Sequence, residues 1–366
     1  MKRVPFMKRV LQILGLVVLA PLLVLLFYST LDHADLLERT NAWYGIDYLS
    51  PLWLGLAMIL PVVLLFGGGW KRTAAAAAAV TILYLGMFGD FSLSVLLPKT
   101  PAVPDAAKIR VAALNVEYYA NGLRTVLDSV RAMDADVVFL SENAVPDSLK
   151  SEARRIVAPM EFVMGHDNST AILSKYPIVE FHEVELPSYE ASLSGSNDIA
   201  EMSDHIHRSF THAVLNVRGV HIHVLSVRLI AGRPKNNAVD EQLRWGRYLL
   251  DVQMKEVASF TRYVTHLSGP VIFGGDLNAP PSSKPIRKIR AYATDAYMET
   301  HIWGDCTFRT EAPAMRLDYL FCMNHVVPLA AVRPLLKVSD HFPVTAEFLL
   351  PVSFDTTAIG RRLAGL

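Results

Sequence analysis

The segment GGDLNAPPSSKP, residues 274–285, places an acid and an amide two positions apart, after an apolar run and before a proline-rich loop. Asp276 and Asn278 have two explanations at this level. Both residue types hydrogen-bond to their own backbone, so the segment is explained as a simple turn. Alternatively, both side chains hold a metal ion, a water molecule or a phosphate in one site, because alternate residues of an extended segment share a side.

Polar residues recur at the ends of apolar runs elsewhere in the chain. Asn115 ends RVAALN, Glu142 ends DVVFLSE and Asp318 begins DYLF, while SDHFPV places Asp340 and His341 before the last run. Carboxylate and amide oxygens without thiolates suit Mg²⁺ or Mn²⁺. A histidine beside an aspartate supplies an acid or a base near neutral pH. Together these residues predict metal-assisted hydrolysis of a phosphate ester by an activated water.

The elements that must position these residues read as an α/β domain. Apolar residues at three- and four-residue spacing predict amphipathic helices over 122–134 and 239–264. Strands are predicted at 109–116, 135–142, 170–178, 212–227, 269–278, 316–322 and 342–350. Strands in both hairpin and crossover contexts indicate mixed sheets covered by helices. The polar segment 181–208 is long for a connection and is expected at the rim of a site.

Asn115, Glu142, GDLN (275–278), RLDYLF (316–321) and SDHFPV (339–344) resemble, in this order, the motifs of the endonuclease/exonuclease/phosphatase superfamily. That superfamily includes deoxyribonuclease I, apurinic-site endonucleases, neutral sphingomyelinases and inositol-polyphosphate 5-phosphatases. One motif alone is weak evidence, whereas five in the same order are specific. The resemblance covers residues 108–350 and implies a four-layer α/β/β/α sandwich of two mixed sheets, with the site at one end of both sheets.

The resemblance also implies a metal site. Glu142 is expected to be the main ligand, with Asn115 and Asp340 near the metal. The expected ion is Mg²⁺, or Mn²⁺ in its place.

The catalytic roles implied by the resemblance fall on four other matching positions. Asp276 is expected to position or deprotonate the attacking water, and Asn278 to bind the scissile phosphate. His341 is expected to contact the phosphate or to take part in proton transfer. Asp318 is expected to orient His341.

Two further residues are candidates for substrate binding. Arg228 departs from the family pattern, because members often carry His or Tyr after the strand that matches HVLSVRL. Arginine stays protonated and is no proton donor, but it can hold a phosphate through two hydrogen bonds and stabilise transition-state charge. A structural salt bridge is the other explanation. Asn168, in NSTAILSKYPI, resembles a family residue that approaches the substrate.

The remaining histidines of the central strands are not assigned to the site. His221 and His223 alternate along HIHV, and a solvated strand edge is the preferred explanation for this pair. His205, His207 and His212 are discounted as well.

The first hundred residues predict a membrane region, residues 1–98, with three transmembrane helices at about 10–28, 51–70 and 73–97. Lys2, Arg3, Lys8 and Arg9 precede the first run, and Lys71 and Arg72 separate the second from the third. Positive charge favours the cytoplasmic side. The chain is therefore expected to be a multi-pass protein of the plasma (inner) membrane, with a linker at 99–107, the catalytic domain (108–350) on the extracytoplasmic side and a tail at 351–366.

Charge and cysteine content narrow the function. The 35 basic and 35 acidic side chains give no net charge, which weighs mildly against a nucleic-acid substrate. Cys306 and Cys322 make no zinc motif, although they can form a disulfide outside the cytoplasm. The expected function is a membrane-anchored phosphoesterase that cleaves phosphodiester bonds, of the nuclease type. A phospholipid or sphingolipid phosphodiesterase or phosphatase, acting on a lipid head group, stays open, as does an inactive membrane adaptor.

Overall fold

The computed structural model describes residues 6–33, 57–88, 90–97, 106–166, 169–190, 205–231, 239–311 and 315–351. The chain divides into two compact units, Met1–Phe91 with Pro280–Arg287 and Ser92–Ala279 with Lys288–Leu366. In the described part of the chain, both β-sheets belong to the second unit.

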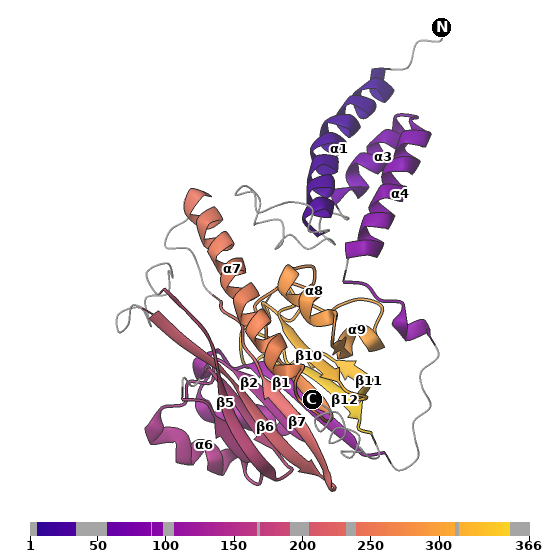
Figure 1. Ribbon diagram of the computed structural model, residues 1–366. Helices are drawn as coiled ribbons and strands as arrows, with labels where there is room; N and C mark the ends of the chain where they lie inside the picture. The colour runs from indigo at the N-terminus through magenta and orange to yellow at the C-terminus, as the bar shows by residue number, and fades with distance from the viewer. Residues whose placement is uncertain are drawn as a thin grey trace, which may run out of the picture. The chain divides into compact units, whose positions relative to one another are not determined.

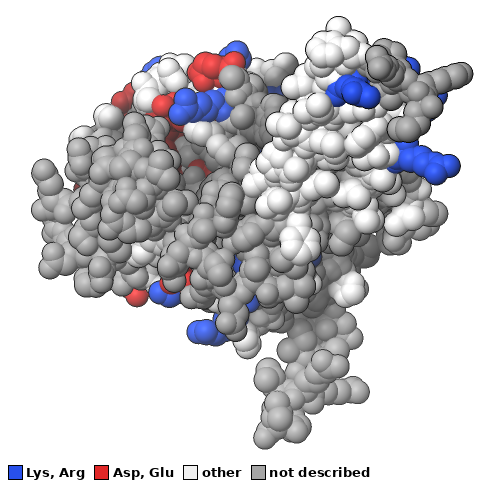
Figure 2. All heavy atoms as spheres, turned by 90° about the horizontal axis from the view of Figure 1, so that it is seen from above, with Lys and Arg blue, Asp and Glu red and all other residues white. Residues whose placement is uncertain are grey.

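The N-terminal unit contains α1 (Phe6–His33), α3 (Ile59–Gly67) and α4 (Lys71–Phe88). Helices α1 and α3 pack closely at Gly15, where a Cβ atom would lie 2.9 Å from the side chain of Leu65. Gln12 donates a hydrogen bond to the carbonyl of Gly68, with a donor–acceptor distance of 2.7 Å. Many apolar side chains of these helices remain exposed, and their surface is largely uncharged (Figure 2). A surface of this kind is typical of contact with lipid or another protein.

The prediction of three transmembrane helices was wrong for the described residues, among which a single helix is long and apolar enough to cross a bilayer. That helix is Phe6–Phe27, with 22 residues and a mean hydropathy of 2.8. The described helix of the second run, α3, has nine residues and ends at a run of glycines. Nine residues rise only about 14 Å, roughly half of the bilayer core. Helix α4 begins with Lys71 and Arg72 and is rich in alanine, which lowers its hydropathy.

The first sheet has the strand order β11-β12-β1-β2-β4-β3. Strand β1 pairs antiparallel with β12 and parallel with β2, so the sheet is mixed. The strands are β1 (Lys108–Asn115), β2 (Val137–Ser141), β3 (Glu161–Met164), β4 (Thr170–Ser174), β11 (Val327–Val332) and β12 (Val344–Leu349).

The second sheet has the strand order β5-β6-β7-β8-β10-β9. Strand β8 pairs parallel with β7 and antiparallel with β10, so this sheet is mixed as well. The strands are β5 (Ile178–Glu190), β6 (His205–Val217), β7 (Val220–Ser226), β8 (Val271–Asp276), β9 (Thr294–Asp295) and β10 (Asp318–Met323). The two mixed sheets with their helices confirm the predicted α/β fold.

Successive side chains of a strand point to opposite faces of its sheet. Apolar side chains on the facing sides of the two sheets form one core, so the sheets pack face to face (Figure 1). In β1, Val111 and Ala113 face the second sheet, where they join Leu215 and Ile272 in one core. Ala112 and Leu114 of the same strand face the opposite way, toward the helices α5 (Leu123–Ala132) and α6 (Lys150–Val157).

Helix α7 (Val239–Val264) covers the outer face of the second sheet. Phe260 packs on Phe210 and Phe273, with ring centroids 5.2 and 5.0 Å away. The described residues also form shorter helices: α8 (Lys284–Arg290), α9 (Ala296–Thr300) and the 3₁₀ turns η2 (Ser94–Leu96), η3 (Glu117–Tyr119) and η4 (Asp147–Leu149). Helix α9 begins at Asp295, whose carboxylate accepts hydrogen bonds from the first backbone N–H groups.

The histidines of the second sheet lie differently from the prediction. Strand β7 lies between β6 and β8, so His221 and His223 do not lie on a sheet edge. His212 is buried and contacts His223 Nδ1 through its Nε2 at 3.0 Å. The side chains of His205 and His207 lie outside the described residues. The solvated-edge interpretation was therefore wrong for His223, because a strand's neighbours in a sheet are set by the whole topology.

Candidate active site

Asp276 ends β8 where the backbone passes unusually close to other strands. A Cβ atom on Gly274 would collide with the carbonyl oxygen of Tyr319, and one on Gly275 with that of Val227. Gly275 also has a φ of 135°, which L residues rarely adopt. The two glycines that precede Asp276 are thus required by the backbone path that brings its carboxylate to the ends of both sheets.

Both explanations for the spacing of Asp276 and Asn278, a turn and a shared site, apply to the folded segment. Asn278 has a φ of 47°, so the chain turns back and its side chain does not share a strand face with Asp276. Its backbone N–H donates to Asp276 Oδ1 at 3.0 Å, and its Nδ2 donates to Oδ2 at 3.1 Å. The turn itself therefore brings the two side chains together in the same site.

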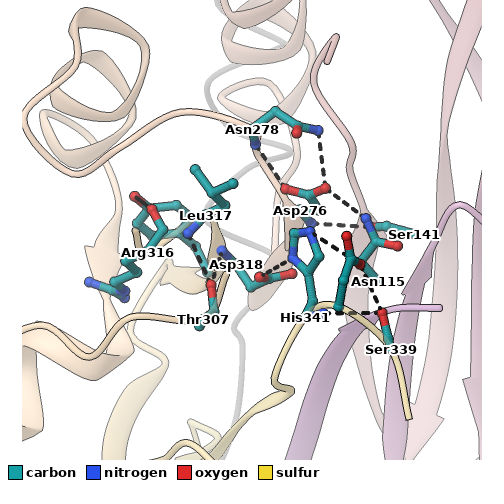
Figure 3. A network of polar contacts seen from close by, with 12 residues as sticks. Asn115, Ser141, Asp276, Asn278, Thr307, Arg316, Leu317, Asp318, Ser339 and His341 are labelled. Atoms are coloured by element: carbon teal, nitrogen blue, oxygen red, sulfur yellow. Dashed lines mark hydrogen bonds and ion pairs between the residues drawn. The ribbon is translucent and has the colours of Figure 1, made fainter. Parts of the chain in front are cut away.

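The ends of β1 and β2 hold Asp276 from the other side (Figure 3). Asn115 Nδ2 donates to Asp276 Oδ2 at 2.9 Å, and the backbone N–H of Asp276 donates to Ser141 Oγ at 3.1 Å. Asp276 is only 1% exposed. Burial raises the pKa of its carboxyl, as does the charge of Asp318, while the charge of His341 and the hydrogen bond from Asn115 oppose the shift.

His341 lies next to Asp318, which begins β10 directly opposite Asp276 in the sheet. The His341 Nδ1 atom is 2.7 Å from Asp318 Oδ2 (Figure 3). The backbone N–H of Asp318 donates in turn to Thr307 Oγ1 at 3.2 Å. Burial lowers the pKa of His341, but the charges of Asp318 and Asp276 outweigh it and raise this pKa to about 10. The imidazole is therefore protonated at neutral pH.

Arg228 follows β7 and forms an ion pair with Glu142, which follows β2. Arg228 Nη2 lies 2.5 Å from Glu142 Oε1, and both side chains are largely buried. Burial opposes the charge on Arg228, but Glu142 outweighs it and raises the pKa of the guanidinium. The buried Nε of Arg228 has no hydrogen-bond partner among the described residues. A buried donor of this kind calls for an acceptor, such as a phosphate oxygen.

Glu117 is a site residue that the sequence interpretation missed. Its Oε2 accepts a hydrogen bond from the backbone N–H of Asp340 at 3.1 Å, and its own N–H donates to Asn115 Oδ1 at 2.9 Å. Burial and the nearby charges of Asp340 and Glu142 raise its pKa. Its signal in the sequence is its position: Glu117 is an acid two residues after Asn115, and Asp276 and Asn278 are separated by the same spacing.

The backbone around Glu117 is strained. Glu117, Tyr118 and Tyr119 have φ values of 48°, 51° and 61°. Left-handed backbone costs about 1–2 kcal/mol for each residue with a side chain. Hydrogen bonds hold the turn, including one from the Tyr118 N–H to the carbonyl of Glu142 at 3.2 Å. Strain of this kind gathers at functional sites, where surrounding contacts offset its cost.

The structure brings most of the predicted site residues together. Asn115, Asp276 and Asn278 form one hydrogen-bonded group, and His341 with Asp318 lies beside Asp276. Asp340 is joined to Asn115 through Glu117 rather than directly. Asn168 lies outside the described residues. The roles assigned to all of these residues stay predictions.

Two groups of potential metal-ligating side chains lie in this region, and the carboxylate oxygens in both suit a hard divalent cation. Asp276, Asp318 and His341 each offer one ligand atom within 4.8 Å of the others, and the buried Oδ1 of Asp318 has no hydrogen-bond partner among the described residues. The three predicted ligands, with Glu117, provide carboxylate and amide oxygens as Mg²⁺ prefers. Arg228 neutralises part of the charge of Glu142. The group of Glu142, Asn115, Asp340 and Glu117 therefore differs from a purely acidic site.

Comparison with known proteins identifies the family of this fold. The Endonuclease/Exonuclease/phosphatase family profile matches residues 112–341, more than half of the chain, and the protein belongs to that family. No curated protein matches the sequence.

Three solved structures resemble the chain at low sequence identity. An endonuclease/exonuclease/phosphatase from Bacteroides vulgatus is 16% identical and has a TM-score of 0.51; the match covers 67% of this chain and all of that one. A Beutenbergia cavernae endonuclease/exonuclease/phosphatase is 17% identical over 67% of this chain and 73% of its own, with a TM-score of 0.46. The human nocturnin catalytic domain is 16% identical over 67% and 95%, with a TM-score of 0.47.

Proposed function

We propose that the protein is a divalent-metal-dependent hydrolase of phosphodiester bonds, with nucleic acid as its first candidate substrate. The observation that carries the proposal is the convergence of Asp276, Asp318 and His341 within 4.8 Å of one another, beside the buried Arg228–Glu142 pair. Family membership supports the reaction class, because members of this family are phosphoesterase hydrolases.

Each residue of the site has a distinct part in this proposal. Asp276, held by Asn115 and Asn278, orients the attacking water and accepts its proton, since its raised pKa brings it closer to neutral pH. His341, oriented by Asp318, donates a hydrogen bond to a phosphoryl oxygen and stabilises the charge that develops there.

Arg228 and Asn278 complete the contacts to the substrate. The Nε of Arg228, which has no hydrogen-bond partner among the described residues, donates a hydrogen bond to the phosphate. The positive charge of the guanidinium also attracts the phosphate. Glu142, Asn115 and Asp340 would hold Mg²⁺ or Mn²⁺, with Glu117 beside them. When bound, such an ion neutralises charge on the phosphoryl group and lowers the pKa of water.

Hydrolysis of bis-p-nitrophenyl phosphate tests the reaction class. The purified full-length chain in detergent is expected to release p-nitrophenol with Mg²⁺ or Mn²⁺ and to stop when EDTA is added. Asp276→Asn and His341→Ala are expected to lose this activity while keeping the thermal unfolding midpoint within a few degrees. Wild-type turnover no higher than that of both variants would favour the inactive membrane adaptor instead.

A lipid head group is the second candidate substrate. The observation that favours it is the apolar helix Phe6–Phe27, which would hold the site near a bilayer and raise the local concentration of lipid. Supercoiled plasmid and vesicles of sphingomyelin or phosphatidylinositol phosphate, offered at equal phosphorus concentration, separate the two. Cleavage of the plasmid alone supports the nuclease, and release of a head group alone supports the lipid enzyme.

The proposed location is a membrane, with the catalytic domain on the extracytoplasmic side. Lys8 and Arg9 lie at the start of α1, so a single crossing by this helix would leave the following chain outside. A reporter fused after Leu366 tests the orientation in a bacterial host. Alkaline phosphatase activity from the fusion agrees with the proposal, whereas fluorescence of a cytoplasm-only reporter contradicts it.

A further inference from the structure

The segment that carries Arg228 follows β7 without secondary structure, yet several of its backbone groups are hydrogen-bonded. The Leu229 N–H donates to the carbonyl of Asp276 at 3.2 Å, and the Leu229 carbonyl accepts from Asn278 Nδ2 at 3.0 Å. The segment is thus joined directly to the loop of Asp276 and Asn278. The position of the guanidinium beside Glu142 depends on whatever fixes this pair of loops.

Gln253 of α7 contacts both loops with one atom. Its Nε2 donates to the carbonyl of Ile230 and to the carbonyl of Asn278, each at 3.0 Å. The side chain is only 1% exposed. A buried amide that satisfies two carbonyls of different loops fixes the distance between them, because the loss of either bond leaves a buried acceptor unpaired.

Glu256 lies one turn further along α7 and binds a different backbone group of the same segment. It accepts a hydrogen bond from the Ile230 N–H at 2.8 Å and forms an ion pair with Arg208 Nε at 3.2 Å. Arg208 Nη2 donates in turn to the carbonyl of Arg228 at 2.5 Å. Glu256 is fully buried and Arg208 nearly so. Three side chains from α7 and β6 therefore hold both ends of the segment.

Stability alone gives little reason for this arrangement. Removing two charges from water costs several kcal/mol for each ion, and a buried ion pair is often no more stabilising than apolar residues of similar size. The pair is explained by what it orders, because Arg208 Nη2 and Glu256 Oε2 each hydrogen-bond to the backbone of the Arg228 segment.

We propose that Gln253 and Glu256 are positioning residues that hold Arg228 and Asn278 in the geometry needed for the phosphate. The inference deepens the proposed function and rests on it for the catalytic readout. Neither residue contacts the reacting atoms. Both act through the two loops, Glu256 with the help of Arg208.

A double-mutant cycle tests the proposal on the full-length chain with bis-p-nitrophenyl phosphate. Glu256→Gln and Gln253→Met are each expected to lower kcat about 10- to 100-fold with a much smaller change in KM, as for residues that orient a catalytic group. In an Arg228→Ala background, Glu256→Gln is expected to add less than about a threefold loss, since the residue it positions is already absent.

Tyr263→Phe provides the matched control. Tyr263 lies on the same helix and hydrogen-bonds to His212 rather than to either loop. Its removal is expected to lower the unfolding midpoint without a comparable loss of kcat. Equal losses of kcat in Tyr263→Phe and Glu256→Gln, or a full additive loss in the double variant, would overturn the proposal.

Hydrogen–deuterium exchange separates this inference from the proposed reaction. In Glu256→Gln and Gln253→Met, peptides that cover 227–231 and 276–279 are expected to exchange faster together, while β10 stays protected. Tyr263→Phe is expected to leave both peptides unchanged. If the two variants show this joint increase in exchange but the wild type hydrolyses nothing, the proposed function fails and the positioning stands. If the 276–279 peptide does not respond, the positioning fails whatever the activity.

Discussion

His341 and His212 are both buried, with 4% and 3% of their surface exposed, but their surroundings differ in charge. His341 lies between the carboxylates of Asp318 and Asp276, which raise its pKa to about 10. His212 contacts Tyr263 and His223, and burial lowers its pKa to about 3. Burial alone favours the neutral form in both cases. The neighbouring charges decide which histidine carries a proton.

The hydrogen bonds around His212 confirm that a neutral ring fits there. The carbonyl of Ser268 accepts from His223 Nε2, which leaves His223 Nδ1 as an acceptor for His212 Nε2. His212 Nδ1 then accepts from the hydroxyl of Tyr263 at 2.8 Å. With both rings neutral, each donor of this chain of contacts meets one acceptor. His182 stacks against His212 at 5.5 Å and adds no opposite charge. The carboxylate-rich end of the sheets thus favours a charged histidine, and the surroundings of His212 favour a neutral one.

Asp276→Asn is expected to give the largest effect that this comparison predicts. The amide keeps the shape but accepts no proton and removes one charge that raises the pKa of His341. We expect kcat for bis-p-nitrophenyl phosphate to fall about 10³-fold, in the range of a lost general base. Activity within tenfold of the wild type would mean that Asp276 is structural, as the turn it forms with Asn278 would allow.

His341→Ala is expected to lower kcat about 10²-fold, in the range found for removal of one donor to a developing charge. The equivalent change at the other histidine, His212→Ala, is expected to lower the unfolding midpoint with less than a threefold change in kcat. Equal effects of the two substitutions on kcat would contradict the division between a reactive and a structural histidine.

Asp318→Asn sharpens the comparison by removing the charge nearest to His341, which is also one of the charges that raise the pKa of Asp276. The pKa of His341 is expected to fall well below about 10, because the nearest opposite charge is gone. The titration is followed from the histidine Cε1–H resonance by NMR in the metal-free protein, with His341→Ala used for assignment. An unchanged pKa would show that Asp276 alone holds the proton on His341.

The smallest effect concerns stability at acid pH. The pKa of His212 is about 6.5 unfolded and about 3 folded, so below pH 6.5 the unfolded chain binds more protons and stability falls toward pH 3. The loss is at most about 1.4 kcal/mol per pH unit. His212→Phe is expected to flatten this part of the dependence of the unfolding midpoint on pH, whereas Lys175→Ala, at an exposed ion pair with Asp134, leaves it unchanged.

Much of the fold and of the site was predictable because the motifs depend on local chemistry. The apolar runs place Asn115, Glu142 and Asp276 at strand ends, and the order of the five motifs indicated the family. The two glycines before Asp276 are visible in the sequence as well. They are required because a Cβ atom at either position would collide with the carbonyl of Tyr319 or of Val227, which are distant in sequence. Among the described residues, one helix rather than three passes the length and hydropathy needed for a membrane span, because hydropathy along the sequence does not register where α3 ends.

The sequence by itself determined which residue types stand at the ends of the strands, and with them the reaction class. Only the tertiary structure decided how they are paired: Glu142 with Arg228, Glu117 with Asp340, and Asn115 with Asp276 across 161 positions of sequence. It also decided that the pKa of His341 is raised while that of His212 is lowered. The physical reason is that desolvation and Coulomb interactions depend on distances of a few ångströms in space, which the spacing of residues along a chain does not specify.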